Sequence, residues 1–233
     1  MKKIIGITGP SKFTPELRAM VSGCFDAIPL DINQDGEDLN QVLPLCNAII
    51  LGGGVDIMPC TYGEEVLNRR GLSKFDKARD DRELAIFEWC GANKKPLLGI
   101  CRGHQLILSH LGCPLMTDIS HSEICHNPLN QDIDMGGHPV HFVDCEEEYK
   151  ESYFEQELVN SFHHQAVVHS RFARGYGLIG TAKLVQVPSK PGERIIELAK
   201  GEGWLSCQWH PECDWDSNKA SEIVLDKFAK MIK

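Results

Sequence analysis

The stretch PLLGICRGHQLI (96–107) places a cysteine between two glycines directly after an apolar run. Residues 99–103 have the form G-x-C-x-G, the cysteine counterpart of the turn that presents a nucleophilic serine between a strand and a helix. Such a turn predicts a thiol at the carboxyl end of a sheet and at the N-terminus of a helix, where the dipole favours thiolate. The alternative from these residues alone is a buried, idle thiol beside glycines required for packing.

The sequence before this stretch alternates short apolar runs with longer amphipathic ones. Strands of a mainly parallel sheet are predicted at 2–8, 27–32, 47–53 and 96–101. Helical spacing occurs at 14–26, 37–46 and 80–92, with Asp80 or a neighbour as the N-cap of the last helix. Alternation of this kind predicts a doubly wound α/β sheet with flanking helices.

The sequence after this stretch is less regular and predicts a small antiparallel section. HPVHFVD (138–144) alternates like an exposed antiparallel strand, and further strands are predicted at 182–189, 194–200 and 204–212. An amphipathic helix with Ser217 as its N-cap is predicted to follow. Without repeats or a linker, residues 1–233 are expected to form one domain.

Net charge and hydropathy argue against several classes of binding partner. The chain has 233 residues and a formal charge of −9, without a cluster of Lys and Arg, which argues against nucleic acid and anionic membranes. No apolar run reaches the roughly 20 residues of a membrane span, and the N-terminal apolar run is too short for a signal peptide. We therefore expect a cytoplasmic protein whose ten cysteines are reduced thiols.

A cysteine nucleophile needs a base, and CQWHPE (207–212) is the best source of one. His210 and Glu212 are two residues apart after a predicted strand, so both side chains can project to one side of an extended chain. The carboxylate would then hold the imidazole in one tautomer. The alternative is a polar residue at a strand end beside an exposed acid.

A glycine run supplies candidate oxyanion donors. ILGGGVDIMP (50–59) ends a predicted strand with three glycines, whose backbone N–H groups can approach a substrate closely, as can the amide of Arg102. Phosphate binding is the alternative for such a loop. It is disfavoured because no Gly-Lys-Ser/Thr follows and G-x-G-x-x-G spacing is absent.

Taken together, the motifs resemble the class I glutamine amidotransferase family, and more narrowly its γ-glutamyl-hydrolase-like branch that contains γ-glutamyl-γ-aminobutyrate hydrolases. The resemblance spans nearly the whole chain. It rests on LGGGVDIMPCTYGEE (51–65), DKARDDRE (76–83), PLLGICRGHQLI (96–107), NSFHHQAV (160–167) and CQWHPE (207–212). It implies a flavodoxin-like fold and a single class I glutamine amidotransferase-like domain.

The resemblance also implies roles for individual residues. Cys101 is similar to the nucleophile, His210 to the general acid and base, and Glu212 to the carboxylate of a Cys-His-Glu triad. Gly53 and the Arg102 amide resemble the oxyanion donors. Substrate contacts are implied for Gly54, Gln105, His163, His164 and Gln165. Tyr62, Asp76, Arg79 and Asp80 match recurring family positions, with a structural ion pair between Asp76 and Arg79 as the simplest interpretation of those two.

Two departures from the family pattern bear on the substrate. Gly52 stands where the branch often has Pro or Thr, and LILSHLGCPL (106–115) replaces a more usual Asn and Gly-Gly. The expected activity is hydrolysis of the γ-glutamyl amide of a small amine, such as γ-glutamyl-γ-aminobutyrate, through a thioester. An amine that bears a carboxylate would need a nearby cation, for which the candidates are Arg69, Arg70, Arg79 and Arg102.

Two other functions stay open at this point. A glutaminase subunit would pass ammonia to a separate synthetase partner. A non-catalytic protein on this fold would bind metal or a partner, since His121, Cys125, His126, His138 and His141 form a loose cluster. That spacing matches no recognised closed zinc site, so no metal and no cofactor are expected. The expected partners are a small γ-glutamyl substrate and, for assembly, a second copy in a homodimer.

Overall fold

The predicted strand-turn-helix around Cys101 lies at the centre of a nine-stranded sheet. The computed structural model describes residues 2–9, 14–32, 38–62, 75–119, 140–169, 177–183 and 194–232. Five strands run parallel in the order β2-β1-β3-β4-β11. Their bounds are Ile28–Asp31, Ile4–Thr8, Ala48–Leu51, Leu97–Ile100 and Trp204–Cys207. The four predicted N-terminal strands are confirmed, each two or three residues shorter than expected.

The antiparallel section is larger than the sequence predicts. It extends the same sheet in the order β11-β10-β9-β6-β7. The added strands are β10 (Arg194–Gly201), β9 (Gly177–Lys183), β6 (Val140–Cys145) and β7 (Gln156–Asn160), and β5 (Leu115–Met116) pairs separately with β8 (Ala166–Val167). Of the strand expected at 182–189, the structure describes only 182–183, which end β9.

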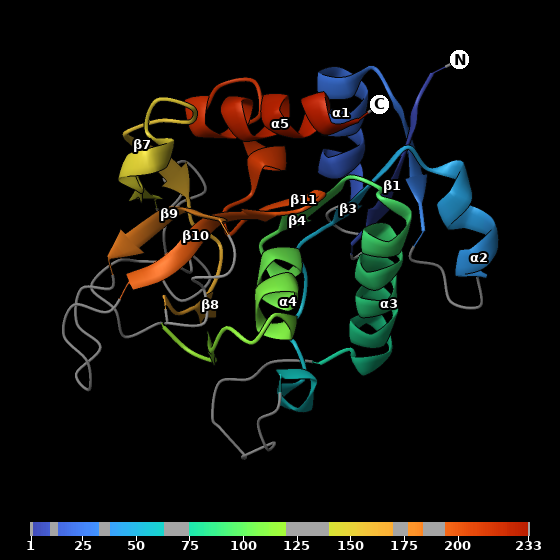
Figure 1. Ribbon diagram of the computed structural model, residues 1–233, viewed down its shortest axis with the longest axis horizontal. Coiled ribbons are helices and arrows are strands. Elements are labelled where there is room, and N and C mark those ends of the chain that lie inside the picture. Colours follow the sequence, from blue (N-terminus) through green and yellow to red (C-terminus); the bar gives the residue numbers. More distant parts are fainter. Residues whose placement is uncertain are drawn as a thin grey trace.

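Helices cover both faces of the sheet, as Figure 1 shows. Helices α1 (Thr14–Phe25) and α5 (Lys219–Met231) lie on one face, over a core that includes Ile5, Ile7 and Phe228. Helices α3 (Lys77–Asn93) and α4 (Arg102–His110) lie on the other, over a core that includes Ile49 and Ile107. The three layers are those of a doubly wound α/β fold.

Helix ends are set by side chains that the sequence patterns assign differently. Asp76 accepts the backbone N–H of Arg79 at 3.0 Å and is the N-cap of α3, so the cap is a residue near Asp80 rather than Asp80 itself. Asn218, not Ser217, caps α5 by accepting from Ser221 N at 3.1 Å. The helix predicted at 37–46 is a single turn, α2 (Leu39–Val42), followed by a 3-10 turn at Leu43–Leu45 that contains a proline.

Two further sequence expectations concern the chain as a whole. The nine cysteines within the described ranges are all free thiols. No helix in those ranges is both long and apolar enough to cross a bilayer.

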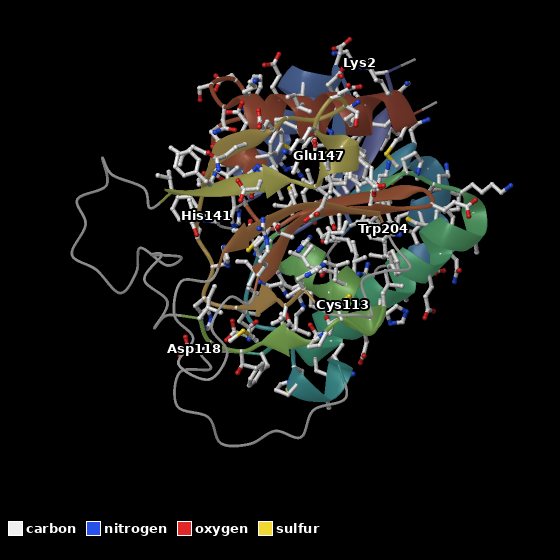
Figure 2. The ribbon with its side chains drawn as sticks, turned by 60° about the vertical axis from the view of Figure 1, so that its left-hand side comes forward. Lys2, Cys113, Asp118, His141, Glu147 and Trp204 are labelled. Carbon is white, nitrogen blue, oxygen red and sulfur yellow. The ribbon has the colours of Figure 1, made fainter. Side chains whose placement is uncertain are left out.

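Figure 2, turned toward the antiparallel section, labels His141 on β6 and Trp204 at the start of β11.

Candidate active site

Cys101 occupies a strained turn between β4 and α4. Its φ of 50° and ψ of −101° lie outside the regions that L-residues prefer. Strain of this kind typically costs about 1–3 kcal/mol and is retained mainly at functional sites. The flanking glycines serve close packing rather than the turn itself: a Cβ on Gly99 would lie 3.0 Å from Gly103, and Gly103 sits directly against the carbonyl of Leu51. The turn predicted from G-x-C-x-G is therefore present, with its strain at the cysteine.

The turn is held from two sides. Cys101 N donates to Cys207 O on β11 at 2.9 Å, and Cys101 O accepts Gln105 N at 3.0 Å to begin the α4 ladder. The thiol is therefore at the N-terminus of a nine-residue helix, 6% exposed and close to the end of β11.

His210 and Glu212 follow β11 and lie beside Cys101. His210 Nδ1 is 2.7 Å from Glu212 Oε1, which leaves Nε2 as the ring nitrogen for the hydrogen bond that joins the ring to Cys101. Burial disfavours a charged imidazole, but the negative charges of Cys101 and Glu212 outweigh it and hold the pKa of His210 well above its ordinary value. The structure thus brings the three predicted triad residues into one chain of contacts.

Asn160, at the end of β7, fixes the backbone of His210. Its side-chain Oδ1 accepts His210 N at 2.9 Å, and its Nδ2 donates to His210 O at 2.8 Å. The same Nδ2 is 2.9 Å from Asp214 Oδ2. An amide that satisfies both backbone groups of one residue leaves that residue little freedom to rotate, so Asn160 positions the imidazole from the antiparallel part of the sheet.

The glycine run after β3 faces the same site. A Cβ on Gly53 would lie 2.7 Å from His210 Cε1, so the backbone of Gly53 rests against the imidazole edge. Arg79 Nη2 donates to Gly52 O at 3.2 Å and to Gly53 O at 2.9 Å. Because C=O and N–H point in opposite directions across a trans peptide, the N–H groups of Gly53 and Gly54 are directed away from Arg79.

Behind this loop lies a buried ion network that joins α3 to α4. Arg102 makes ion pairs with Asp80 and Glu83, and Arg79 Nε donates to Glu83 Oε1 at 2.8 Å. Thr8 Oγ1 donates to the same oxygen at 2.6 Å. Although burial raises the pKa of Glu83, the two guanidinium groups outweigh it and lower that pKa overall.

This network corrects two expectations. The guanidinium of Arg102 is 1% exposed and paired with acids, while its backbone amide directly follows Cys101. Arg79 pairs with Glu83 rather than with Asp76, whose carboxylate instead caps the helix. Arg79 and Arg102 are therefore engaged within the protein and do not serve as cations for a leaving amine.

The predicted substrate contacts come from the glycine loop, from α4 and from the segment 163–165, and Gln105, His163 and Gln165 are buried. Gln105 Nε2 donates to Gln165 O at 2.9 Å and to Gln208 Oε1 at 3.1 Å. His164 Nε2 is 2.8 Å from Asp56 Oδ1, a bond that raises the pKa of His164 against the effect of burial. Gly54 packs against the guanidinium of Arg79. His163 Nε2 lies 3.9 Å from Glu197 Oε1 on β10.

Several expected residues lie outside the described residues. These are Arg69 and Arg70 among the candidate cations, and His121, Cys125, His126 and His138 of the loose metal cluster. The side chain of Tyr62 is likewise not described. His141, the last member of that cluster, contacts Glu197 at 3.0 Å.

Sequence reasoning missed Asn160, Glu83 and Glu197. The first two stand inside quoted motifs, but nothing local in the sequence marks their partners: Asn160 bonds a residue 50 positions away, and Glu83 pairs with Arg102, 19 positions away. Glu197 could have been found from the sequence, because it is an acid within the apolar run RIIELAK (194–200). A charged side chain at a buried strand position needs a partner.

A cysteine joined to an imidazole that a carboxylate holds, beside backbone amides that point away from Arg79, has the groups needed for acyl transfer from an amide. In acyl transfer of this kind a thiolate acts as nucleophile, an imidazole moves the proton, and backbone amides stabilise the oxyanion.

Comparisons with known proteins identify the family of the chain. The family model for peptidase C26 matches residues 16–212. The glutamine amidotransferase-like protein YvdE of Lactococcus lactis is 34% identical over 200 residues, which cover 83% of this chain and 77% of that protein. The gamma-glutamyl-CDP-amidate hydrolase of Campylobacter jejuni is 32% identical over 130 residues, which cover 56% of this chain and 48% of that protein.

Solved structures support the fold. A glutamine amidotransferase from Thermotoga maritima aligns with a TM-score of 0.58 at 15% identity, covering 91% of this chain and 76% of that one. The CTPS glutaminase domain of Trypanosoma brucei, with bound acivicin, aligns with a TM-score of 0.61 at 14% identity and covers 100% of this chain and 95% of that one. By sequence and by fold, the chain therefore belongs to the peptidase C26 family of class I glutamine amidotransferase-like hydrolases.

Proposed function

We propose that this protein hydrolyses the γ-glutamyl amide bond of a small γ-glutamyl amine, such as γ-glutamyl-γ-aminobutyrate. The observation that carries the proposal is the chain of contacts from Cys101 through His210 to Glu212, with the Gly53 backbone against the imidazole. The similarity to a γ-glutamyl-CDP-amidate hydrolase supports the choice of a γ-glutamyl bond.

The reaction begins with the Cys101 thiolate, which attacks the γ-carbonyl carbon to form a tetrahedral intermediate. The amides of Gly53 and Arg102 stabilise its oxyanion. The imidazolium of His210 gives its proton to the leaving nitrogen as the C–N bond breaks, and a γ-glutamyl thioester remains on the enzyme. His210, now neutral, takes a proton from water, whose oxygen attacks the thioester and releases glutamate.

Gln105 and Gln165 hold the glutamyl group in this proposal. Both N–H bonds of the Gln105 amide are directed to Gln165 O and Gln208 Oε1. The amide therefore offers its oxygen, an acceptor, to a substrate. An acceptor at this point suits the α-ammonium of a glutamyl group. His164, bonded to Asp56, and the backbone of Gly54 are further polar groups proposed to contact the substrate.

The test is an assay of glutamate and amine release with a panel of substrates: γ-glutamyl-γ-aminobutyrate, other γ-glutamyl amines, folate polyglutamate and glutamine. We expect turnover of a γ-glutamyl amine by the isolated protein, and a loss of at least about 1000-fold in kcat for Cys101→Ser. Cys213→Ser, at an exposed cysteine, is the matched control and should keep wild-type activity.

The same panel separates this proposal from a glutaminase subunit. Preference for free glutamine, or activity only after a synthetase is added, would replace the hydrolase with an ammonia donor. Full activity of Cys101→Ser would remove the covalent mechanism altogether.

A further inference from the structure

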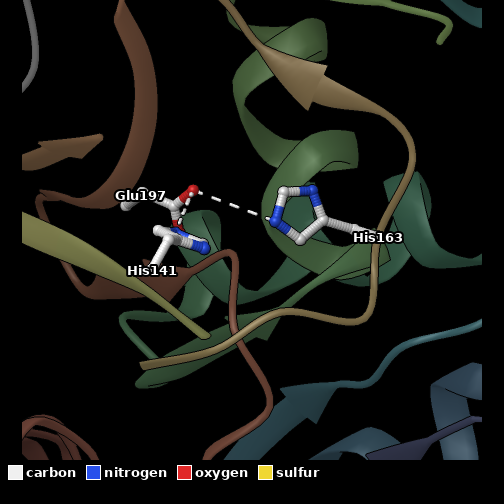
Figure 3. Close-up of side chains that lie close together, drawn as sticks. All are labelled: His141, His163 and Glu197. Atoms are coloured by element: carbon white, nitrogen blue, oxygen red, sulfur yellow. Dashed lines mark ion pairs between the residues drawn. The ribbon is translucent and has the colours of Figure 1, made fainter. Parts of the chain in front are cut away.

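Three side chains capable of binding a metal meet in the antiparallel part of the fold, separate from the Cys101 contacts. His141 comes from β6, His163 from the segment after β7, and Glu197 from β10. Their ligand atoms all lie within 4.8 Å of one another, and all three residues are at most 4% exposed. Figure 3 shows the two imidazoles converging on the carboxylate.

The distances suit a small ion. His141 Nε2 is 3.0 Å from Glu197 Oε1, and His163 Nε2 is 3.9 Å from the same oxygen. Ligands about 2.0–2.1 Å from a tetrahedral zinc ion lie roughly 3.3–3.4 Å apart. The two distances fall on either side of that value, so small side-chain shifts would bring the three atoms to one ion.

The tautomer of His163 leaves its Nε2 atom available to bind a cation between these groups. His163 Nδ1 is 2.9 Å from Gln165 O, and because a carbonyl only accepts, Nδ1 carries the hydrogen. In the neutral ring, Nε2 then directs a lone pair toward a buried carboxylate. A histidine that binds a metal ordinarily donates its other N–H to a carbonyl or carboxylate in this way.

Glu197 gives an independent indication. The residue is fully buried, and within the described ranges neither of its carboxylate oxygens accepts a hydrogen bond of ordinary geometry. Its ion-pair contacts are with the two imidazoles. A buried carboxylate without aligned donors is costly unless a positive charge compensates it.

We propose that His141, His163 and Glu197 form a binding site for a divalent transition-metal ion, with zinc favoured by the two-histidine, one-carboxylate ligand set. The ion would join β6 and β10 to the segment that carries Gln165. Since Gln165 O also accepts from Gln105, the site would brace the substrate-binding side of the pocket without taking part in the chemistry of Cys101.

The test measures zinc content in the full chain carrying Cys101→Ser, which removes the competing thiolate. The protein is treated with a chelator, loaded with zinc, desalted and analysed by elemental mass spectrometry. We expect about one equivalent of zinc per chain, and a cobalt-substituted sample should show the visible absorption of a four-coordinate ion. Glu197→Gln and His163→Gln in this background should each weaken binding by at least about 100-fold. His110→Gln, at the end of α4, should not.

Absence of stoichiometric zinc overturns the proposal. So does retention of zinc in both ligand variants, which would place the ion on other groups of the chain. If circular dichroism shows that a ligand variant does not fold, the test is made on the parent Cys101→Ser protein instead. Its Tm should rise when zinc is added and fall when a chelator removes the zinc. An unchanged Tm in that protein also overturns the site. None of these outcomes depends on hydrolase activity.

Discussion

Gly53 matters because it has no side chain. Its backbone lies against His210, and it does not carry a positive φ, so alanine fits the backbone but not the space. We predict that Gly53→Ala displaces the imidazole and lowers kcat/KM by about 100-fold while the far-UV spectrum stays unchanged. Gly91→Ala is the control, because no atom lies within 4 Å of its added Cβ. Equal activities of the two variants would refute the close approach.

Glu212 sets the pH range of the site. The raised pKa of His210 means that its proton is lost only as pH rises through that raised value, where the general acid for the leaving amine disappears. We predict that Glu212→Gln moves the alkaline limb of the kcat/KM profile to lower pH and reduces the rate at least about 100-fold. The exposed Glu222→Gln is the control, and an unmoved limb would contradict the assignment.

The raised pKa of His210 also makes the folding stability depend on pH. A histidine whose pKa is raised by folding adds stability that is complete below its ordinary pKa of about 6.5. That stability is lost as pH rises through the folded value. The triad therefore favours the folded state under acid and neutral conditions, opposite in direction to the buried carboxylates.

At the scale of elements, β7 carries a polar residue whose function is to hold a neighbouring loop. Asn160 ends that strand and bonds both backbone groups of His210. We predict that Asn160→Ala lowers kcat by about 10- to 100-fold with little change in KM, because the base is released while the substrate contacts remain. Asn93→Ala, at the end of α3, is the control. A change in KM alone would argue for a role in binding.

The strands differ in how well the sequence reveals them. Parallel strands such as β3 and β4 are buried on both faces, so AIIL (48–51) and LLGI (97–100) stand out as apolar runs. By contrast, β7 reads QELVN and alternates irregularly between exposed and buried positions, which is why it was not predicted. The proximity of Cys101, His210 and Glu212 could be predicted because local motifs mark these residues. Asn160 could not, since its partner lies 50 residues away.

At the scale of the whole molecule, the buried ions connect β1, the glycine loop, α3 and α4. Glu83 is fully buried and serves Arg79, Arg102 and Thr8 at once. We predict that Glu83→Gln lowers the free energy of unfolding by about 3–5 kcal/mol, because it leaves buried guanidinium charge uncompensated. Thr8→Val removes a neutral hydroxyl, which donates to Glu83 Oε1 and accepts Gly52 N at 3.4 Å, and should cost about 1–2 kcal/mol. Urea unfolding of the two variants measures the difference.

Acid should weaken the same network. The pKa of Glu83 is lowered by folding, so its contribution is complete above its ordinary pKa of about 4.5 and is lost as pH falls through the folded value. Glu83→Gln should therefore show a shallower loss of stability between neutral and acid pH than the wild type. Parallel acid limbs in the two proteins would count against the ion network.

The adjacency of β3, β4 and β11 in the sheet has a consequence for how precisely the site is made. Gly53, Cys101 and His210 each stand one to three residues beyond the end of one of these strands. Their separation is thus measured out by interstrand spacing, about 4.8 Å per step, which is among the least variable lengths in proteins. The sheet therefore fixes the distances between the groups proposed to react. Its central amides should exchange with deuterium only on global unfolding, and catalytic geometry should persist until that same event.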